Sequence, residues 1–384
     1  MEKKINILVD CTYVTFPLMG MDIYTTGLLL SLSKCDKINV SVLIWSKWEK
    51  MFAELLFGQS VNTISMNFLD KIWKRLPSLI SKNKDYPLQK KLKKNNINVV
   101  LSPHINKNMM IFPTLIQFGV LHDLQAIKIW EYYGDLKRME QEKNHLRDVI
   151  NKIPHIICIS KNTQKELFQM FDKTSVVVYN RVPNNLTGHF PKEKIVDTIL
   201  NKRYILDVNS LKKYKNAFRL VQAFSDISSR IPHILYLKGA PNAVEEEIEL
   251  KNIIREKQLE SRVFIDTQPR DESEMEYLYS HAEIIVSPSL MEGFGFSPVE
   301  GILHKKPVII SNIETLLETT QGLVPSFDPF SIEDISQVLY REITNPPTKE
   351  ILDERASVIK KKYSTRNMIE GYVGYIIETI KDKH

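Results

Sequence analysis

Two glutamates flank a glycine-rich turn in the last third of the chain. The stretch reads Glu292-Gly-Phe-Gly-Phe-Ser-Pro-Val-Glu300, so the carboxylates stand eight positions apart. Apolar runs at 282–289 and 307–311 enclose it, and both are typical of buried strands. A strand, a glycine turn and a short helix bring backbone N–H groups toward an anionic ligand. The stretch therefore predicts an anion-binding turn with two carboxylates beside it.

The same residues also permit a purely structural interpretation. Ser297 suits the N-cap of a helix and Pro298 its first position, which places Glu300 at the third position of a capping box. Glu300 would then contribute about 1 kcal/mol to helix stability, and Glu292 would be a solvated loop residue. The glycines and the flanking strands together favour the functional interpretation, in which Glu292 faces a ligand from the turn.

A lysine at the start of a predicted helix is the second candidate. The run 204–218 predicts a strand ending at Val208, a basic loop, and a helix that begins near Asn216. Lys215 therefore lies at a helix N-terminus, where the macrodipole disfavours a cation. A cation in that place suggests an anionic partner, although a solvated lysine-rich loop would have the same composition.

Three further residues follow predicted strands of the first half. His122 stands in Phe118-Gly-Val-Leu-His-Asp-Leu124, at the end of a buried run, and His104 ends a second run nearby. A lone histidine is more often structural than functional. Gly20 lies in the loop after the first strand, where it serves a plain turn or a close approach to phosphate.

Composition restricts the class of protein. The chain has 384 residues, which suggests two domains, with 43% hydrophobic and 26% charged residues. The net charge of +6 is mild and indicates no nucleic-acid partner. The three cysteines form no C-x-x-C pair, so a disulfide framework and a zinc site are unsupported. With no signal peptide and no long apolar run, we expect a cytoplasmic protein.

Short β-branched runs alternate with amphipathic helices along the chain, which predicts two doubly wound parallel α/β units. A stretch without strong periodicity, 180–201, predicts the linker between them. We expect strands at 5–9, 40–44, 99–102, 116–121, 156–160, 175–179, 204–208, 234–237, 263–265, 284–286 and 308–310. Ligands of such folds bind at the carboxyl ends of the strands, in a cleft between the domains.

The chain resembles a known family at several of these places. The Glu-x7-Glu stretch closely resembles the signature of retaining glycosyltransferases of family 4, also called group 1, which have the two-domain GT-B fold. The strand, loop and helix around Lys215, the His122-Asp-Leu tripeptide and the segment 154–167 are similar to other elements of that family. The resemblance extends from the first loop to about Ser311.

This resemblance implies a domain division and a reaction. The Rossmann-like acceptor domain would span 1–190, joined by a C-terminal helix at 365–384 that crosses back to it, and a nucleotide-sugar domain would span 200–364. The enzyme would move a hexose-type sugar from a nucleotide-diphosphate sugar to a glycan or lipid-linked acceptor, in bacterial surface polysaccharide synthesis. The two domains would face a central cleft, and no cofactor would be needed.

The resemblance also implies roles for the candidate residues. Lys215 would bind the donor diphosphate, Glu292 the donor sugar and Glu300 the ribose hydroxyls, while His122 would contact the transferred sugar. The remaining expected donor contacts come from Gly20 and from the backbone of Phe294, Gly295 and Phe296. No Asp-x-Asp pattern and no metal-ligand cluster occur, so we expect a metal-independent site.

Departures from the family pattern keep other functions open. Tyr214 stands where many relatives carry an arginine before the lysine. Asn209 stands where many have a glycine after the strand, and Asp22 stands where a glycine of the first loop is common. Lys212 or Lys213 would supply a second cation. The alternatives are a non-catalytic partner that binds nucleotide sugar and a nucleotide-sugar epimerase of the same fold.

A basic and apolar segment between Phe68 and Lys94 suggests a membrane contact. Nine lysines and arginines stand there among Phe68, Trp73 and several aliphatic residues. Such a mixture suits an interfacial segment on anionic lipid, and an ordinary packed helix with a solvated basic face would look the same. The expected location is then peripheral, on the cytoplasmic face of the inner membrane.

Overall fold

The computed structural model divides the chain into two compact units. It describes residues 4–15, 21–66, 87–106, 109–182, 202–240 and 243–382. The first unit comprises Met1–Ile159, Thr163–Tyr179 and Thr365–His384, and the second comprises Ser160–Asn162 and Asn180–Ser364. Each unit is a parallel α/β domain with its own sheet, as the alternation of strands and helices predicts.

The first unit is built on a seven-stranded sheet of order β3-β2-β1-β4-β5-β6-β7. Its strands are β1 (Ile5–Asp10), β2 (Ile38–Trp45), β3 (Val61–Met66), β4 (Val99–Ser102), β5 (Ile116–Leu121), β6 (His155–Cys158) and β7 (Val176–Val177). The strand order changes direction between β1 and β4. Loops that follow these two strands therefore open at the place where doubly wound sheets receive ligands.

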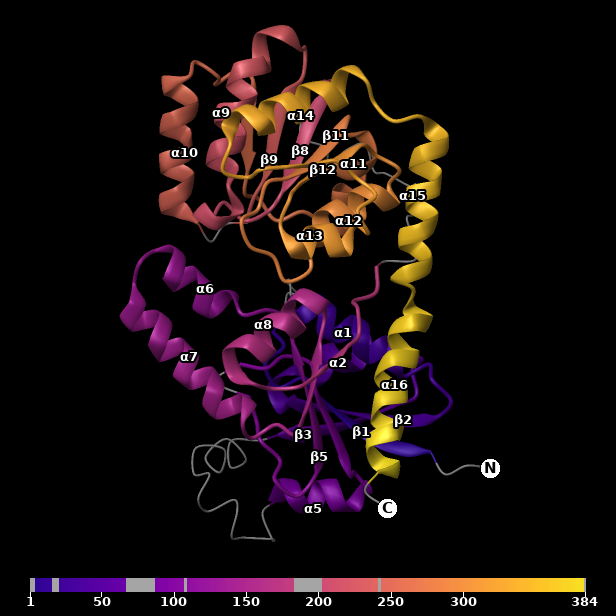
Figure 1. The fold of residues 1–384 in the computed structure, drawn as a ribbon. Coiled ribbons are helices and arrows are strands. Elements are labelled where there is room, and N and C mark those ends of the chain that lie inside the picture. Colours follow the sequence, from indigo (N-terminus) through magenta and orange to yellow (C-terminus); the bar gives the residue numbers. More distant parts are fainter. Residues whose placement is uncertain are drawn as a thin grey trace. The chain divides into compact units, whose positions relative to one another are not determined.

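Helices connect these strands, and one of them comes from the far end of the chain. The helices are α1 (Met21–Leu32), α2 (Glu49–Leu55), α5 (Pro87–Lys94), α6 (Gln125–Tyr132), α7 (Leu136–Ile150), α8 (Lys161–Phe171) and α16 (Thr365–Lys381). The hydroxyls of Tyr24 on α1 and Tyr372 on α16 lie 2.6 Å apart in a hydrogen bond. The C-terminal helix thus packs onto the first unit, as predicted (Figure 1).

The second unit has a six-stranded sheet of order β10-β9-β8-β11-β12-β13. Its strands are β8 (Tyr204–Val208), β9 (Ile234–Lys238), β10 (Val263–Asp266), β11 (Ile284–Ser287), β12 (Val308–Ser311) and β13 (Ser326–Phe327). Here the order changes direction between β8 and β11, which are hydrogen-bonded neighbours.

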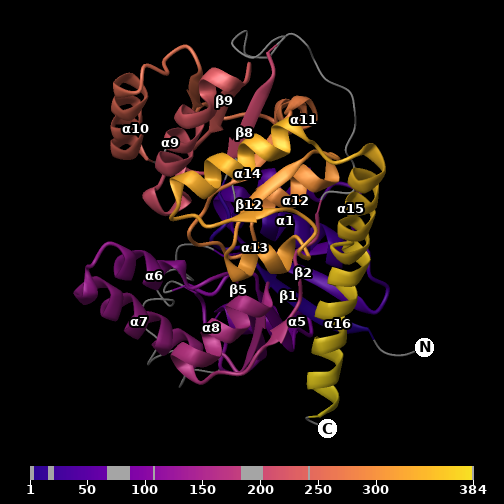
Figure 2. The ribbon, with the colours of Figure 1, turned by 45° about the horizontal axis from the view of Figure 1, so that its top comes forward.

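Helices cover both faces of this second sheet (Figures 1 and 2). They are α9 (Ala217–Ile227), α10 (Val244–Glu256), α11 (Glu272–His281), α12 (Phe296–Leu303), α13 (Glu314–Thr319), α14 (Ile332–Thr344) and α15 (Lys349–Lys362). One core joins α9, α10 and α14 to β8 and β9, with Leu220, Leu235, Leu250 and Ile335 fully buried. The helix α12 packs with α15 and against β11.

Three sequence predictions concern residues that lie wholly or partly outside the described ranges. Gly20, most of the linker and residues 67–86 of the basic apolar segment lie outside them. Within α5, Leu88 and Leu92 are buried, so the apolar residues of that part belong to the core of the first unit. In the described ranges, no helix combines the length and the apolar character that crossing a bilayer requires. The three cysteines are free.

Candidate functional site

The switch in strand order of the second unit brings two candidate residues together. Lys215 lies in the loop after β8, in a short 3-10 turn over Lys213–Lys215, and Glu292 lies in the loop after β11. Because β8 and β11 are neighbouring parallel strands, both loops leave the same edge of the sheet. This is the place where ligands of doubly wound folds bind.

Lys215 and Glu292 form a mostly buried ion pair. The Lys215 Nζ lies 2.6 Å from Glu292 Oε1, and the two side chains are only 12% and 10% exposed. Ser289 Oγ donates a second hydrogen bond to the same oxygen, at 2.8 Å. The Thr315 hydroxyl donates to the Glu292 backbone carbonyl at 3.0 Å. Glu292 is therefore held in place, and the interpretation of it as a solvated loop residue is wrong.

Backbone and amide contacts fix the loop that carries Lys215. Asn216 adopts the left-handed conformation, with φ of 66°, just before α9 begins. Its buried side-chain amide donates to the carbonyls of Pro288 and Pro329, at 3.0 and 2.8 Å. The Leu290 N–H donates to the Tyr214 carbonyl at 2.8 Å. These bonds tie the loop after β8 to the loop after β11, which keeps the lysine and the glutamate in register.

The helix α12 begins two residues earlier than an N-cap at Ser297 would require. Gly295 is its N-cap, with φ of 77°, and Ser297 lies inside the helix. A Cβ on Gly295 would lie 2.3 Å from Leu316 Cδ2, so only glycine fits. The capping box predicted for Ser297 and Glu300 is therefore wrong, and Glu300 is the fifth helical residue. No side chain caps this N-terminus, so its first backbone N–H groups have no capping side chain as acceptor.

Two aromatic residues of the turn differ in their surroundings. The Phe294 ring is 2% exposed and packs against Tyr363, with centroids 5.2 Å apart. Phe296 is 39% exposed and lies 4.9 Å from Phe294. Phe294 can therefore meet a ligand through its backbone alone, while Phe296 also presents part of its ring.

Glu300 has an unusual protonation equilibrium. Burial raises the pKa of this carboxyl group to about 7, although the nearby Tyr279 hydroxyl lowers it. Tyr279 itself is 2% exposed and stacks on His304, with ring centroids 5.1 Å apart. Glu300 can thus hold or release a proton near neutral pH; when ionised it only accepts hydrogen bonds, and when protonated it can also donate one.

A third carboxyl group at this edge escaped sequence reasoning. Asp207, the fourth residue of β8, is 2% exposed, and Asn209 Nδ2 donates to its Oδ1 at 2.7 Å. Burial raises the pKa of Asp207 to about 7, against the lowering effects of Asn209 and the Lys215 cation. The signal in the sequence is an acidic residue inside the apolar run of a predicted strand.

The two lysines considered as a second cation have other partners. Lys212 Nζ lies 3.2 Å from a carboxylate oxygen of Glu246, and Lys213 Nζ lies 2.9 Å from Glu249. Both glutamates belong to α10. The structure therefore gives Lys215 alone, of these three, a carboxylate partner on the turn before α12.

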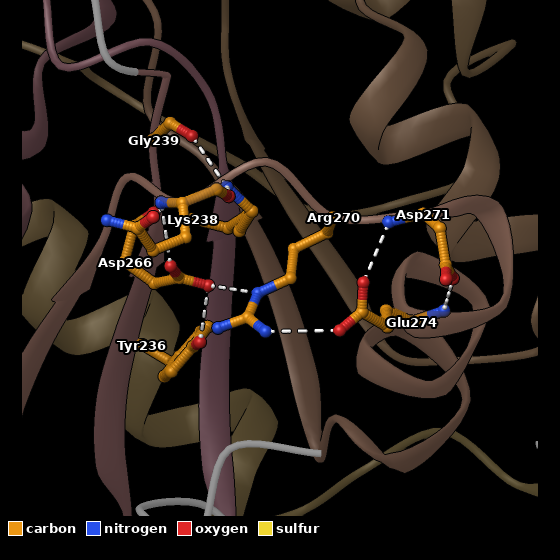
Figure 3. Close-up of polar contacts among 8 residues, drawn as sticks. Tyr236, Lys238, Gly239, Asp266, Arg270, Asp271 and Glu274 are labelled. Atoms are coloured by element: carbon orange, nitrogen blue, oxygen red, sulfur yellow. Dashed lines mark hydrogen bonds and ion pairs between the residues drawn. The ribbon is translucent and has the colours of Figure 1, made fainter. Parts of the chain in front are cut away.

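A separate polar network closes the carboxyl ends of β9 and β10 (Figure 3). Asp266 accepts hydrogen bonds from the Tyr236 hydroxyl at 2.7 Å and from Arg270 Nε at 2.9 Å. Arg270 Nη1 also reaches Glu274, the third residue in the capping box of α11. Burial alone would raise the pKa of Asp266, but these donors outweigh it and hold the pKa low.

Lys238 completes this network from the end of β9. Its Nζ donates to the backbone carbonyls of Gly239 and Gln268, both at 2.8 Å. The side chains of Tyr236, Lys238, Asp266, Arg270 and Glu274 in Figure 3 thus each have at least one protein partner. These bonds hold the loop between β10 and α11 in place.

The first unit holds the candidate histidine. His122 follows β5, is 8% exposed, and its Nε2 donates to the Pro103 carbonyl at 2.9 Å. Burial and the neighbouring His104 lower the pKa of His122 to about 3, although the bond to Pro103 opposes this. Tyr24 packs edge-on against the ring, with centroids 4.5 Å apart. His122 is therefore neutral near pH 7 and cannot act as a cation.

No group of three or more potential metal-ligating side chains occurs in the part of the chain that the structure describes.

Comparison with known proteins finds a family match in the second half of the chain. Residues 191–359 match the family model described as glycosyl transferases group 1. Over this range the chain is similar to that glycosyltransferase group. The matched range contains the site built by β8, β11 and α12.

Relatives with curated descriptions include enzymes of bacterial O-antigen synthesis. The serotype-specific mannosyltransferase WbdA of Escherichia coli is 26% identical over 271 residues, which are 66% of this chain and 33% of that protein. The O-antigen chain mannosyltransferase B of Escherichia coli is 24% identical over 64% of this chain and 66% of its own length. The chain therefore matches about a third of WbdA.

Solved structures show the same GT-B fold. Anabaena Alr3699/HepE, in complex with UDP and glucose, superposes with a TM-score of 0.70 and 14% identity. That match covers 98% of this chain and 100% of the Anabaena chain.

Proposed function

We propose that this glycosyltransferase retains the configuration of the sugar that it transfers from a nucleotide-diphosphate donor, and that the donor binds in the second unit. One observation carries the proposal. At the switch in strand order, the Lys215 cation, the Glu292 carboxylate and the uncapped N-terminus of α12 lie on adjoining loops. A cation and free N–H groups together are the standard recognition of a diphosphate.

Each group has a distinct task in this proposal. Lys215 and the first N–H groups of α12 stabilise the charge that develops on the leaving diphosphate. Glu292 accepts hydrogen bonds from hydroxyls of the donor sugar, and Glu300 accepts them from the ribose. His122, which is neutral, contacts the transferred sugar by hydrogen bonding rather than by charge. The diphosphate departs on the face where the acceptor hydroxyl enters, without a protein nucleophile.

The donor and acceptor classes follow from the relatives. Two of them carry the description mannosyltransferase, and a structural neighbour binds UDP. We propose a hexose-type donor and a growing glycan or lipid-linked acceptor of a surface polysaccharide. The reaction needs no metal in this proposal, because Lys215 and the helix N-terminus supply the positive charge.

A thermal-shift screen followed by turnover tests the proposal. A ligand that binds only the folded protein raises its melting temperature, so UDP, GDP and their sugars can be compared directly. The matching donor should then release nucleotide diphosphate in the presence of a lipid-linked acceptor. Saturable binding with no release would show a binding partner rather than an enzyme.

Membrane contact remains part of the proposal. Its sequence support is the basic apolar segment that ends in α5, where Lys90, Lys93 and Lys94 stand on the helix that buries Leu88 and Leu92. Co-sedimentation with anionic and neutral vesicles at low and high salt provides the test. Binding that does not depend on lipid charge or salt would exclude an electrostatic membrane contact.

A further inference from the structure

The buried carboxyl group of Asp207 has no task in the proposed reaction, yet it lies among the charges of the donor site. It feels the Lys215 cation from the loop after β8 and the Glu292 carboxylate from the loop after β11. Burial and, to a smaller extent, the Asp207 charge raise the pKa of the Tyr279 hydroxyl on α11. Asn209 Nδ2 donates a hydrogen bond to Asp207 Oδ1 at 2.7 Å.

The net charge of the donor site depends on the protonation state of Asp207. Lys215 and Glu292 cancel, so an ionised Asp207 leaves a net charge of minus one in a mostly buried place. The diphosphate of a sugar nucleotide carries two negative charges and would add to it. Like charges in a poorly solvated site repel strongly. Such repulsion raises the pKa of a carboxyl group, which then binds a proton.

We propose that Asp207 takes up one proton from solvent when the donor diphosphate binds, and returns it when the diphosphate leaves. The inference rests on the proposed function, because it needs the diphosphate beside Lys215. Asp207 is thus a positioning residue that adjusts the charge of the site without touching the donor. The proton goes to a carboxylate oxygen of Asp207, and no other bond forms or breaks.

The size of the uptake follows from the titration of the free protein. With a pKa of about 7, Asp207 is half protonated at pH 7, so binding takes up about half a proton there and nearly one at pH 8. Donor affinity should fall by up to about tenfold for each pH unit above 7. Glu300 adds a change of opposite sign, because a carboxylate that accepts ribose hydrogen bonds releases its proton.

Calorimetric titration in two buffers with different ionisation enthalpies measures the uptake. The probes are UDP-glucose and GDP-mannose, whose phosphates are esterified at both ends and do not titrate near neutral pH. The wild type should take up about half a proton more at pH 7 than Asp207→Asn. The comparison between these two proteins removes the contribution of Glu300. Asp226→Asn, the same change on the exposed side of α9, should match the wild type.

A second variant covers the case in which Asp207→Asn does not fold. Asn209→Ala removes the amide that favours the charged carboxylate, so the pH at which donor affinity begins to fall should move upward. Equal uptake in wild type and Asp207→Asn, or an unmoved pH profile in Asn209→Ala, overturns the inference while leaving the donor site intact. If neither sugar nucleotide binds the wild type, the proposed function fails and the inference with it.

Discussion

Replacing Lys215 with alanine should cost both fold stability and donor affinity, and the two losses can be measured separately. Sequence reasoning expects this variant to lose transfer and keep its fold. The structure predicts a loss of fold stability as well. The Lys215 Nζ lies 2.6 Å from Glu292 Oε1, and the two side chains are only 12% and 10% exposed. Removing one partner of a buried pair leaves an uncompensated charge, which costs about 3 kcal/mol.

The loss of affinity has a different origin. A charge-assisted hydrogen bond to the diphosphate contributes about 1.5–3 kcal/mol. Its loss should therefore raise the dissociation constant roughly ten- to hundredfold. Urea unfolding gives the stability term, and calorimetry with the nucleoside diphosphate, under conditions where the variant is folded, gives the affinity. Adding Glu292→Gln to Lys215→Ala removes the stranded carboxylate, so the double variant should regain stability without regaining affinity for the diphosphate.

Lys251→Ala is the matched control. Lys251 Nζ forms an ion pair of similar length with Glu247, 2.7 Å, but the lysine is 56% exposed on α10. Such a surface pair contributes about 0.3–0.5 kcal/mol. If Lys215→Ala unfolds and binds the diphosphate as Lys251→Ala does, neither the buried ion pair nor the diphosphate contact has the importance assigned here.

Three further outcomes are expected. Glu300→Gln should weaken binding of the free nucleoside diphosphate. Glu292→Gln should leave that binding unchanged and remove the additional affinity that the sugar gives the donor; equal losses in the two variants would contradict the separate tasks. Activity should survive EDTA, and a complete loss restored by Mn²⁺ would reveal a metal requirement. Asp266→Asn should lower the melting temperature at pH 7 and much less near pH 3. The low pKa of Asp266 stabilises the fold above the unfolded value of 3.8 and not below its own; an equal drop at both pH values would refute this.

The core strands of both sheets were predictable from sequence because they are buried on both faces. The runs at Val99–Ser102, Ile116–Leu121 and Tyr204–Val208 form strands with the predicted bounds. Two edge strands had no such signal. β3 (Val61–Met66) buries only Ile64 and Met66, and β13 has two residues. Half of an edge strand faces solvent, so its composition does not differ from that of a loop.

The predicted helix start of the donor turn failed for a local reason. Ser297, Pro298 and Glu300 satisfy the rules of a capping box, but Gly295 can adopt a positive φ and opens α12 two residues before Ser297. Its contact with Leu316, a residue of α13, is tertiary. Local propensity cannot anticipate a close approach from a separate helix, and the same reason hides the polar network around Asp266.

The pairing of Lys215 with Glu292 lay beyond sequence reasoning because the residues stand 77 positions apart. Only the strand order, with β8 beside β11, brings them together. In the proposed reaction the Lys215 ammonium, which has three N–H donors, binds the diphosphate while Glu292 accepts hydrogen bonds from the sugar hydroxyls. Because Lys215 and Glu292 are paired, the binding of phosphate and sugar should be coupled: a free diphosphate contacts Lys215 alone, whereas a sugar diphosphate also gives Glu292 new donors. A donor should therefore bind more tightly than the sum of its parts suggests.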